Sequence, residues 1–278
     1  MKDYYLKQNL KSLGDTEARL LSSLSARGKG VFTLADAQEA TKGSYAATRK
    51  LVHDLTEKKW LIRLTKGKYL IVPFEAAETG EHTENWFVIA GNLIQSKPYY
   101  ISYYSALDIH EMVTQPVMTV YISTPIRRIP KNILGATFRF IYTKPEDLWG
   151  IEDEWVTPSQ KVKTSDLERT IIDCLDRPDL CGGVSEIAKG IWTKRNEIDY
   201  SKLERYAKKL GRKSVTKRLG FILETYSLGN EKVLSELRQE ITSSYTLLDP
   251  SLPASGRFKN AWKVRANVEP QELNNHRL

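Results

Sequence analysis

Residues 44–73 read SYAATRKLVHDLTEKKWLIRLTKGKYLIVP, and this stretch decides how the N-terminal third of the chain folds. Ser44 is a residue type that caps helices, and apolar side chains then recur at positions i, i+4 and i+8. The side chains that we expect to face the core belong to Ala47, Leu51 and Leu55. This spacing predicts an amphipathic helix that begins after Ser44 and ends near Trp60.

The second half of the same stretch predicts a β-hairpin. Residues 61–64 and 69–72 are rich in Leu, Ile, Val and Tyr, and they flank the turn at residues 65–68, which contains Gly67. Pro73 then ends the second strand, because proline has no N–H to donate to a sheet.

The residues before this stretch predict two more helices. Asp15 can cap a first helix, and its apolar residues are Ala18, Leu20, Leu21 and Leu24. Residues 31–32 form a short β-like pair, and Thr33 caps a brief second helix over residues 34–40. Three helices, a tight turn between the second and the third, and a hairpin with a basic tip constitute a winged helix-turn-helix.

A winged helix fits its third helix into the major groove of DNA, about 12 Å wide, and its hairpin tip reaches the flanking backbone. Arg49 can read guanine with two hydrogen bonds, and lysines of the hairpin can neutralise phosphates. The predicted DNA-contacting residues are Thr33, Ser44, Tyr45, Thr48, Arg49, Lys50, His53, Lys66 and Lys68. Each also fits a simpler interpretation as part of a solvated face, and winged helices also dock proteins.

The composition of the whole chain indicates a globular protein of two domains. The chain has 278 residues, and its charge of 42 − 34 = +8 draws it to polyanions such as nucleic acid, an acidic protein or a membrane surface. No apolar run reaches the roughly 18–20 residues that span a bilayer, so we expect a cytoplasmic protein without a membrane partner. Cys174 and Cys181 are too few for a disulfide framework, and we expect reduced thiols.

Residues 75–81 are polar, acidic and glycine-bearing, which is typical of an exposed linker. We therefore expect a winged helix-turn-helix domain at residues 1–78 and a larger C-terminal domain at residues 79–278. The second domain is predicted to be α+β, with a mixed or antiparallel sheet at about 117–164 and a helical region at about 165–241. An irregular C-terminal segment follows, so the predicted fold class of the chain is α+β.

The common enzyme motifs are absent from the sequence, including the P-loop, HExxH and the G-x-S-x-G elbow. The four histidines are scattered, so we expect no metal site and no cofactor. The densest acidic cluster is SDLERTIID, residues 165–173. Its acids either hold a cation or act in acid–base catalysis, or they complement the helix dipole and pair with Arg169, which is the interpretation we favour.

The helices predicted between residues 194 and 240 carry 12 Lys and Arg against 7 Asp and Glu, a net charge of +5. This excess is compatible with a second surface for polyanions. It is equally compatible with an ordinary solvated face.

Four segments together resemble one protein family. They are LIRLTKGKYLIVP at 61–73, YYISYYSALDIHEM at 99–112, VKTSDLERTIIDCLDRPDLCGG at 162–183 and YTLLDPSLPASGRFKNAWKV at 245–264. Over nearly its whole length, the chain resembles the AbiEi antitoxins of type IV toxin–antitoxin systems, which are associated with phage abortive infection.

This resemblance implies a bacterial or archaeal regulator that is not an enzyme. Its N-terminal domain would bind inverted repeats of duplex DNA in its own promoter and repress the operon. Its C-terminal domain would counteract an AbiEii nucleotidyltransferase toxin without forming a stable complex. The residues that match the family's C-terminal motifs are Tyr103, Ser105, His110, Ser165, Asp166, Glu168, Arg169, Thr170 and Asp173. The alternative is an enzyme acting on nucleic acid, delivered by the winged helix and using Asp166, Glu168 or Asp173.

Overall fold

The computed structural model describes residues 12–72, 85–94, 98–115, 118–158, 160–268 and 273. The chain divides into two compact units. The first unit combines Met1–Lys97 with Lys131–Phe138 and Val156–Lys161, and the second combines Pro98–Pro130 with Arg139–Trp155 and Val162–Leu278. The predicted linker at residues 75–81 lies outside the described residues, so the domain boundary between residues 78 and 79 stays a prediction.

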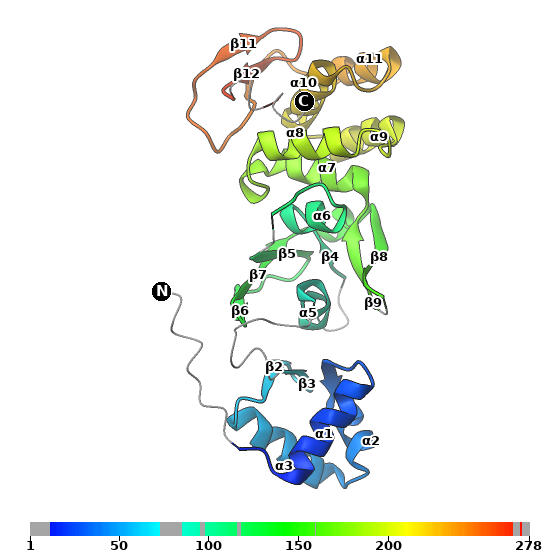
Figure 1. Ribbon diagram of the computed structural model, residues 1–278. Helices are drawn as coiled ribbons and strands as arrows, with labels where there is room; N and C mark the ends of the chain where they lie inside the picture. The colour runs from blue at the N-terminus through cyan, green and yellow to red at the C-terminus, as the bar shows by residue number, and fades with distance from the viewer. Residues whose placement is uncertain are drawn as a thin grey trace. The chain divides into compact units, whose positions relative to one another are not determined.

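The first unit begins with three helices and a small antiparallel sheet (Figure 1). Its elements are α1 (Asp15–Ala26), β1 (Val31–Thr33), α2 (Leu34–Thr41), α3 (Tyr45–Glu57), β2 (Leu61–Thr65), β3 (Lys68–Ile71) and α5 (Trp86–Leu93). The sheet has the order β1-β3-β2, and the register of β2 against β3 shifts between Arg63 and Thr65. The predicted helices, the short β segment and the hairpin are thereby confirmed as elements.

Polar caps fix where α2 and α3 begin. The Ser44 hydroxyl accepts a hydrogen bond from the Ala47 amide at 3.3 Å, as the sequence predicts for a capping serine. At the start of α2, the Asp36 amide donates to the Thr33 hydroxyl at 3.2 Å, and the Asp36 carboxylate accepts from the Thr33 amide at 2.7 Å. This reciprocal pair satisfies amides at the start of α2 that have no partner within the helix.

The buried face of α3 differs from the predicted one. The buried side chains are Thr48, Val52 and Leu55. Ala47 is exposed and Leu51 is half-buried, so the predicted row of Ala47, Leu51 and Leu55 is wrong in its first member. Thr48 can lie inside because its hydroxyl shares a hydrogen bond of 3.1 Å with the Thr41 hydroxyl, which satisfies both groups.

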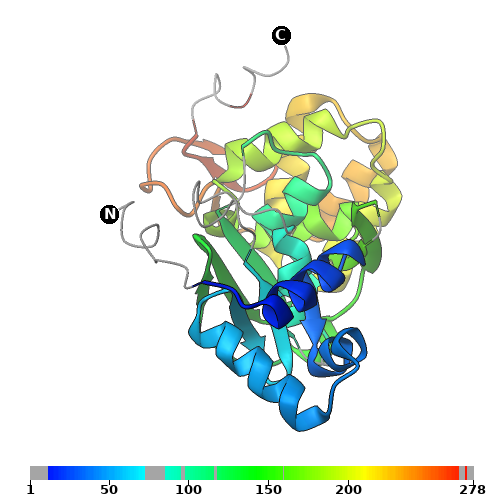
Figure 2. The same ribbon diagram turned by 60° about the horizontal axis from the view of Figure 1, so that its bottom comes forward.

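Apolar side chains from the helices and the sheet form the core of the first unit. Leu24 of α1, Phe32 of β1 and Leu55 of α3 all belong to this cluster. Figure 2 shows α3, in light blue, at the edge of this group of helices. One side of α3 is therefore held by the core, and the other faces solvent.

A six-stranded sheet follows, with strand order β6-β7-β5-β4-β9-β8. The strands are β4 (Tyr100–Ile101), β5 (Thr119–Thr124), β6 (Lys131–Ile133), β7 (Ala136–Tyr142), β8 (Ile151–Thr157) and β9 (Gln160–Ser165). Because β4 pairs antiparallel with β5 and parallel with β9, the sheet is mixed. Five of these strands lie within the range of about 117–164 in which the sequence predicts a sheet, and β4 lies before it.

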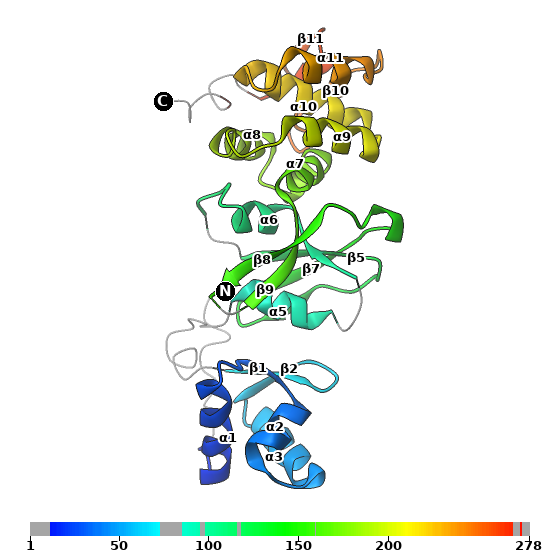
Figure 3. The same cartoon turned by 90° about the vertical axis from the view of Figure 1, so that its right-hand side faces the viewer.

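Helices account for most of the rest of the second unit. They are α6 (Tyr104–Ile109), α7 (Leu167–Asp176), α8 (Val184–Thr193), α9 (Tyr200–Leu210), α10 (Lys213–Tyr226) and α11 (Glu231–Gln239). Figures 1 and 3 show α7 beside α9, and their apolar faces meet in a core that contains Ile171, Leu203 and Leu219. The five helices α7 to α11 lie within the range of about 165–241 in which the sequence predicts a helical region. No helix in the described ranges has the length and apolar character needed to cross a bilayer.

The C-terminal segment forms a three-stranded sheet that is anchored on α10. Its strands are β10 (Thr246–Leu247), β11 (Arg257–Lys259) and β12 (Val264–Ala266), in the order β10-β12-β11. Trp262 lies so close to α10 that a Cβ atom at Gly220 would be 2.0 Å from its ring. Its indole N–H also donates to Glu224 at 2.9 Å. Only glycine at position 220 allows this approach.

Candidate functional site

The outward face of α3 carries most of the predicted DNA-contacting residues. Ser44, Tyr45, Arg49, Lys50 and His53 are all exposed, and Tyr45 has 58% of its surface accessible. Within α3, Lys50 and His53 point away from the buried row, while Tyr45 and Arg49 lie beside it. This face therefore presents hydroxyl, aromatic and cationic groups together.

Two of the predicted contacts turn inward instead. Thr48 is only 1% exposed, so its hydroxyl faces Thr41 and is unavailable to a phosphate. Thr33 is half-buried, and its hydroxyl donates to the Asp36 carboxylate at 2.7 Å. Both threonines are committed to the fold of the first unit.

The hairpin places its two lysines differently. Lys66 is exposed in the turn, next to Gly67, whose φ of 78° is the left-handed conformation that glycine allows. Lys68 is half-buried, and its ammonium donates to the Asn92 side chain of α5 at 3.0 Å. Lys66 is thus the more accessible cation at the tip.

Ion pairs in the first unit leave the cations of α3 unused. The pairs join Arg27 to Glu39, Lys29 to Asp36 and Lys58 to Glu17. Burial opposes ionisation of the Glu17 carboxyl, but hydrogen bonds from the Gly14 amide and Lys58 outweigh it and lower its pKa. Among the described residues, neither Arg49 nor Lys50 takes part in an ion pair, so both charges face solvent.

The second set of predicted residues forms a buried cluster in the second unit. Arg169 of α7 is 2% exposed, and its Nε lies 2.8 Å from an Asp173 carboxylate oxygen. The Tyr100 hydroxyl donates to the other Asp173 oxygen at 2.9 Å, and the Arg169 guanidinium stacks 3.7 Å from the centre of the Trp149 ring. Burial raises the pKa of Asp173, although Arg169 favours the charged carboxylate.

The remaining acids of the motif, Asp166 and Glu168, contact α9. Asp166 caps α7 by accepting a hydrogen bond from the Arg169 amide at 2.8 Å, and it also accepts from the Tyr206 hydroxyl at 2.9 Å. The Lys202 ammonium lies 3.2 Å from Asp166 and 2.7 Å from Glu168. Burial opposes the charge on Lys202, but these two carboxylates together raise its pKa. Asp166 is therefore both the N-cap of α7 and a partner of α9.

The other motif residues join α6 to the strand that precedes α7. His110 contacts the Ser165 carbonyl oxygen through Nε2 at 2.7 Å, and the Ser165 and Thr170 hydroxyls share a hydrogen bond of 2.7 Å. Ser105 accepts a hydrogen bond from the Tyr121 amide at 2.9 Å, so it ties α6 to β5. Tyr103 is buried in the core beside this contact, and its ring meets that of Tyr121 edge to face. The nine motif residues thus lie in one region of the second unit.

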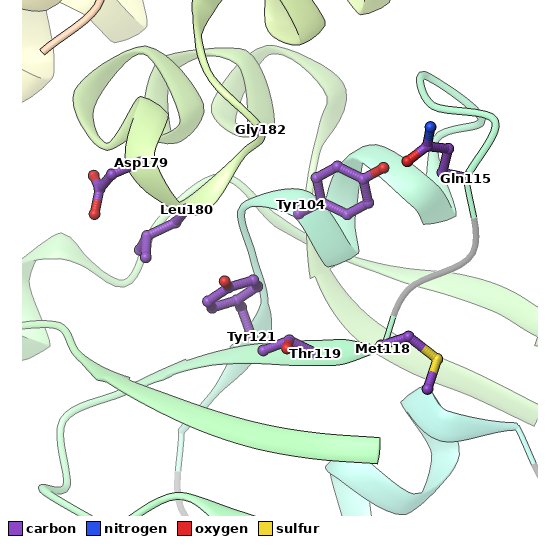
Figure 4. A pocket seen from close by; sticks show the side chains of 8 residues that line it. All are labelled: Tyr104, Gln115, Met118, Thr119, Tyr121, Asp179, Leu180 and Gly182. Atoms are coloured by element: carbon purple, nitrogen blue, oxygen red, sulfur yellow. The ribbon is translucent and has the colours of Figure 1, made fainter. Parts of the chain in front are cut away.

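An open pocket of about 280 Å³ lies beside this region (Figure 4). It is lined by Tyr104, Gln115, Met118, Thr119, Tyr121, Asp179, Leu180 and Gly182. None of the nine motif residues appears among these described lining residues. Ser105 nevertheless holds the pocket wall from behind, because it donates to the Thr119 carbonyl as well as accepting from the Tyr121 amide.

Half of the cations of the basic helices are held in ion pairs. The pairs of α9, α10, α11 and their flanks join Lys202 to Asp166 and Glu168, Lys208 to Glu204 and Glu236, Arg212 to Asp176, Lys213 to Glu240, and Arg238 to Glu224 and Glu231. With Lys194, which pairs with Glu197, six of the twelve Lys and Arg between residues 194 and 240 have an acid as partner. Sequence patterns did not indicate four residues that contact the motif residues, because each lies far along the chain from its partner. These residues are Tyr100, Trp149, Lys202 and Tyr206.

The structure as a whole defines a mixed α+β protein in which N-terminal helices precede the sheets. Residues 19–72 match the family described as "Transcriptional regulator, AbiEi antitoxin", which confirms the family resemblance over that segment. No curated protein sequence matches the chain.

One solved structure with a similar fold is the crystal structure of RV2827C protein from Mycobacterium tuberculosis. It superposes with a TM-score of 0.67 over 91% of this chain and 92% of that one. At 14% sequence identity, this similarity concerns the fold alone.

Proposed function

We propose that this chain is a transcriptional regulator that binds duplex DNA through a winged helix-turn-helix in its N-terminal unit. The observation that carries the proposal is the exposed face of α3, with Tyr45, Arg49 and Lys50, inside the segment that matches the AbiEi regulator family. The order of α1, α2, α3 and the β2–β3 hairpin is the order of elements in a winged helix.

In this arrangement α3 lies in the major groove and the hairpin tip follows the adjacent backbone. Arg49 reads a base edge, because its fork of N–H donors matches the O6 and N7 atoms of guanine. Ser44, Tyr45, Lys50 and His53 flank it, while Lys66 neutralises a phosphate from the hairpin. Thr33 and Thr48 support α2 and α3 from within, for the reasons given above.

Gel shifts of the full chain on duplex DNA from its own upstream region test this proposal. Arg49→Ala should weaken specific binding by about 1–3 kcal/mol and relax the sequence preference, whereas Lys66→Ala should weaken all sequences alike. Lys66→Ala should also reduce the slope of log affinity against log salt by about 0.9. Arg19→Ala, an exposed change on α1 with the same loss of charge, is the matched control. The absence of any salt-sensitive shift with the full chain would refute DNA binding.

We further propose that the regulator is an autorepressor and antitoxin of a type IV system. It binds inverted repeats in its own promoter, and residues 79–278 counteract an AbiEii-like nucleotidyltransferase toxin in the cytoplasm without a stable complex. The support is the family match in the first unit together with the motif residues that meet around α7. The carboxylates of Asp166, Glu168 and Asp173 already contact cations or donors of the fold, which favours a structural role for them over catalysis.

Arg49→Ala separates the two activities in the intact chain. In cells that express the cognate toxin, this variant should still restore growth, while a reporter fused to its own promoter should lose repression. Wild-type chain that fails to restore growth would contradict the antitoxin proposal and leave the repressor proposal standing. A tight complex in size-exclusion chromatography would contradict the type IV assignment.

A further inference from the structure

The C-terminal sheet carries a group of cations in a segment without acids. Residues 250–268 contain four Lys and Arg and no Asp or Glu. The cations are Arg257, Lys259, Lys263 and Arg265. Among the described residues, none of the four takes part in an ion pair. In the basic helices, in contrast, acids lie among the cations, and Lys208, Lys213 and Arg238 are held in ion pairs.

Two aromatic rings are exposed among these cations. Phe258, the central residue of β11, is 60% exposed, and Tyr245, which precedes β10, is 42% exposed. Their rings meet edge to face at 4.8 Å between centroids. Arg265 pairs with Phe258 across the strands and places its guanidinium 5.2 Å from the ring centre. A solvent-exposed phenylalanine between cations has no role in the core, which Trp262 and Val264 occupy from the other side.

The position of this sheet leaves it open to a ligand. All three residues of β11 are exposed, and β11 is an edge strand. Figures 1 and 3 show β11 at the outer end of the helical region of the second unit. We define the C-terminal sheet face by Tyr245, Arg257, Phe258, Lys259, Lys263 and Arg265.

We propose that the C-terminal sheet face binds an unpaired strand of nucleic acid. Exposed rings stack on unpaired bases whatever their sequence, and neighbouring cations neutralise the phosphates between them. In duplex DNA the base faces are stacked on one another, and a short edge strand with a flat ring does not match the groove pattern of base edges. An acidic peptide would use the cations but leave the exposed rings without a partner. This inference is independent of operator binding by α3.

Fluorescence anisotropy of the full chain with a labelled, unstructured RNA of about 12 nucleotides tests the proposal. Phe258→Ala should weaken binding at least about fivefold through the lost stacking. Phe258→Leu, which keeps an apolar side chain at the same position, should weaken it as well. Lys259→Gln should lower the slope of log affinity against log salt by about 0.7. Circular dichroism confirms that each variant is folded.

Matched controls locate the effect. Tyr142→Ala removes an aromatic ring that is 49% exposed elsewhere in the second unit, and Lys208→Gln removes a cation that is paired with Glu204 and Glu236. Both controls should leave the affinity for the labelled RNA unchanged. The proposal is overturned if Tyr142→Ala weakens binding as much as Phe258→Ala. It is equally overturned if the chain shows no Phe258-dependent binding of the labelled RNA, or prefers duplex DNA or polyglutamate at this face.

Discussion

Replacing Asp173 by alanine tests how the buried cluster around α7 contributes to stability. The carboxylate is 4% exposed, lies 2.8 Å from the Arg169 Nε and accepts a hydrogen bond from the Tyr100 hydroxyl. Removing it leaves the guanidinium of Arg169, itself 2% exposed, without its counter-charge. The Tyr100 hydroxyl, also buried, loses its acceptor at the same time.

The loss of one partner from a buried ion pair costs about 3–5 kcal/mol, because the other charge stays desolvated. For a unit of this size, each kcal/mol lowers the melting temperature by about 2–4 °C, so Asp173→Ala should melt about 6–20 °C below the wild-type chain. The double variant Arg169→Met/Asp173→Ala should recover part of this loss, since it removes both charges. Circular dichroism melting curves of the full chain measure all three proteins.

Asp179→Ala is the control for this experiment. Asp179 pairs with Arg177 at 2.7 Å, but the two side chains are 43% and 45% exposed, so the change should cost less than about 1 kcal/mol. If Asp173→Ala costs no more than Asp179→Ala, the cluster does not stabilise the fold. The catalytic alternative makes a different prediction. If the acids are catalytic, the wild-type chain should show a metal-dependent activity on nucleic acid and a higher melting temperature with Mg²⁺ or Mn²⁺. Asp166→Asn should then abolish both the activity and the rise in melting temperature.

Two further predictions concern single residues, Glu17 in the first unit and Gly220 in the second. Lowering the pH from about 7 to about 3.5 should destabilise the first unit, because the pKa of Glu17 is held below that of an unfolded chain by Gly14 and Lys58. This stabilisation is complete at pH values above the pKa of Glu17 in the unfolded chain, and it is lost as the pH falls through its pKa in the folded chain. Urea titrations measure the free energy of unfolding at each pH, and Glu17→Gln should make that free energy depend less on pH. The same pH dependence in Glu17→Gln and in the wild-type chain would contradict this assignment. Gly220→Ala should destabilise the second unit by about 1–3 kcal/mol, because the new Cβ displaces the Trp262 ring. Native melting and an unchanged fluorescence emission maximum would show that Trp262 moves aside without cost.

Local chemistry explains which parts of the fold the sequence could predict. Ser44 caps α3 and Gly67 forms the hairpin turn through contacts within three residues of the chain, so their patterns are readable without tertiary information. Thr48 was misplaced because the group that permits its burial, the Thr41 hydroxyl, lies on another helix. A threonine in an amphipathic pattern looks polar until its partner is known.

The same reasoning applies to the buried cluster. The pairing of Arg169 with Asp173 is an i, i+4 contact, and it follows directly from the sequence. The burial of this ion pair does not follow from the sequence. Its partner Tyr100 is 73 residues from Asp173 along the chain and belongs to a strand of two residues that no sequence pattern indicates. Whether an ion pair stabilises by less than 1 or by several kcal/mol thus depends on contacts that only the fold brings together.

The distribution of ion pairs decides where the net charge of +8 can act on a polyanion. A cation that is held within 3 Å of a carboxylate, as Lys208 and Lys213 are, offers little field to a phosphate, because the pair is nearly neutral beyond the screening length of about 8–10 Å. A cation without such a partner keeps its full charge. By this criterion Arg205, Lys209 and Lys232 of the basic helices also keep their charge, because none of them takes part in a described ion pair and all three are exposed. The outward face of α3 and the C-terminal sheet face add to such cations an exposed aromatic side chain, Tyr45 on the first and Phe258 on the second. This combination of unpaired charge and exposed ring is the reason why we propose these two faces as contacts for nucleic acid.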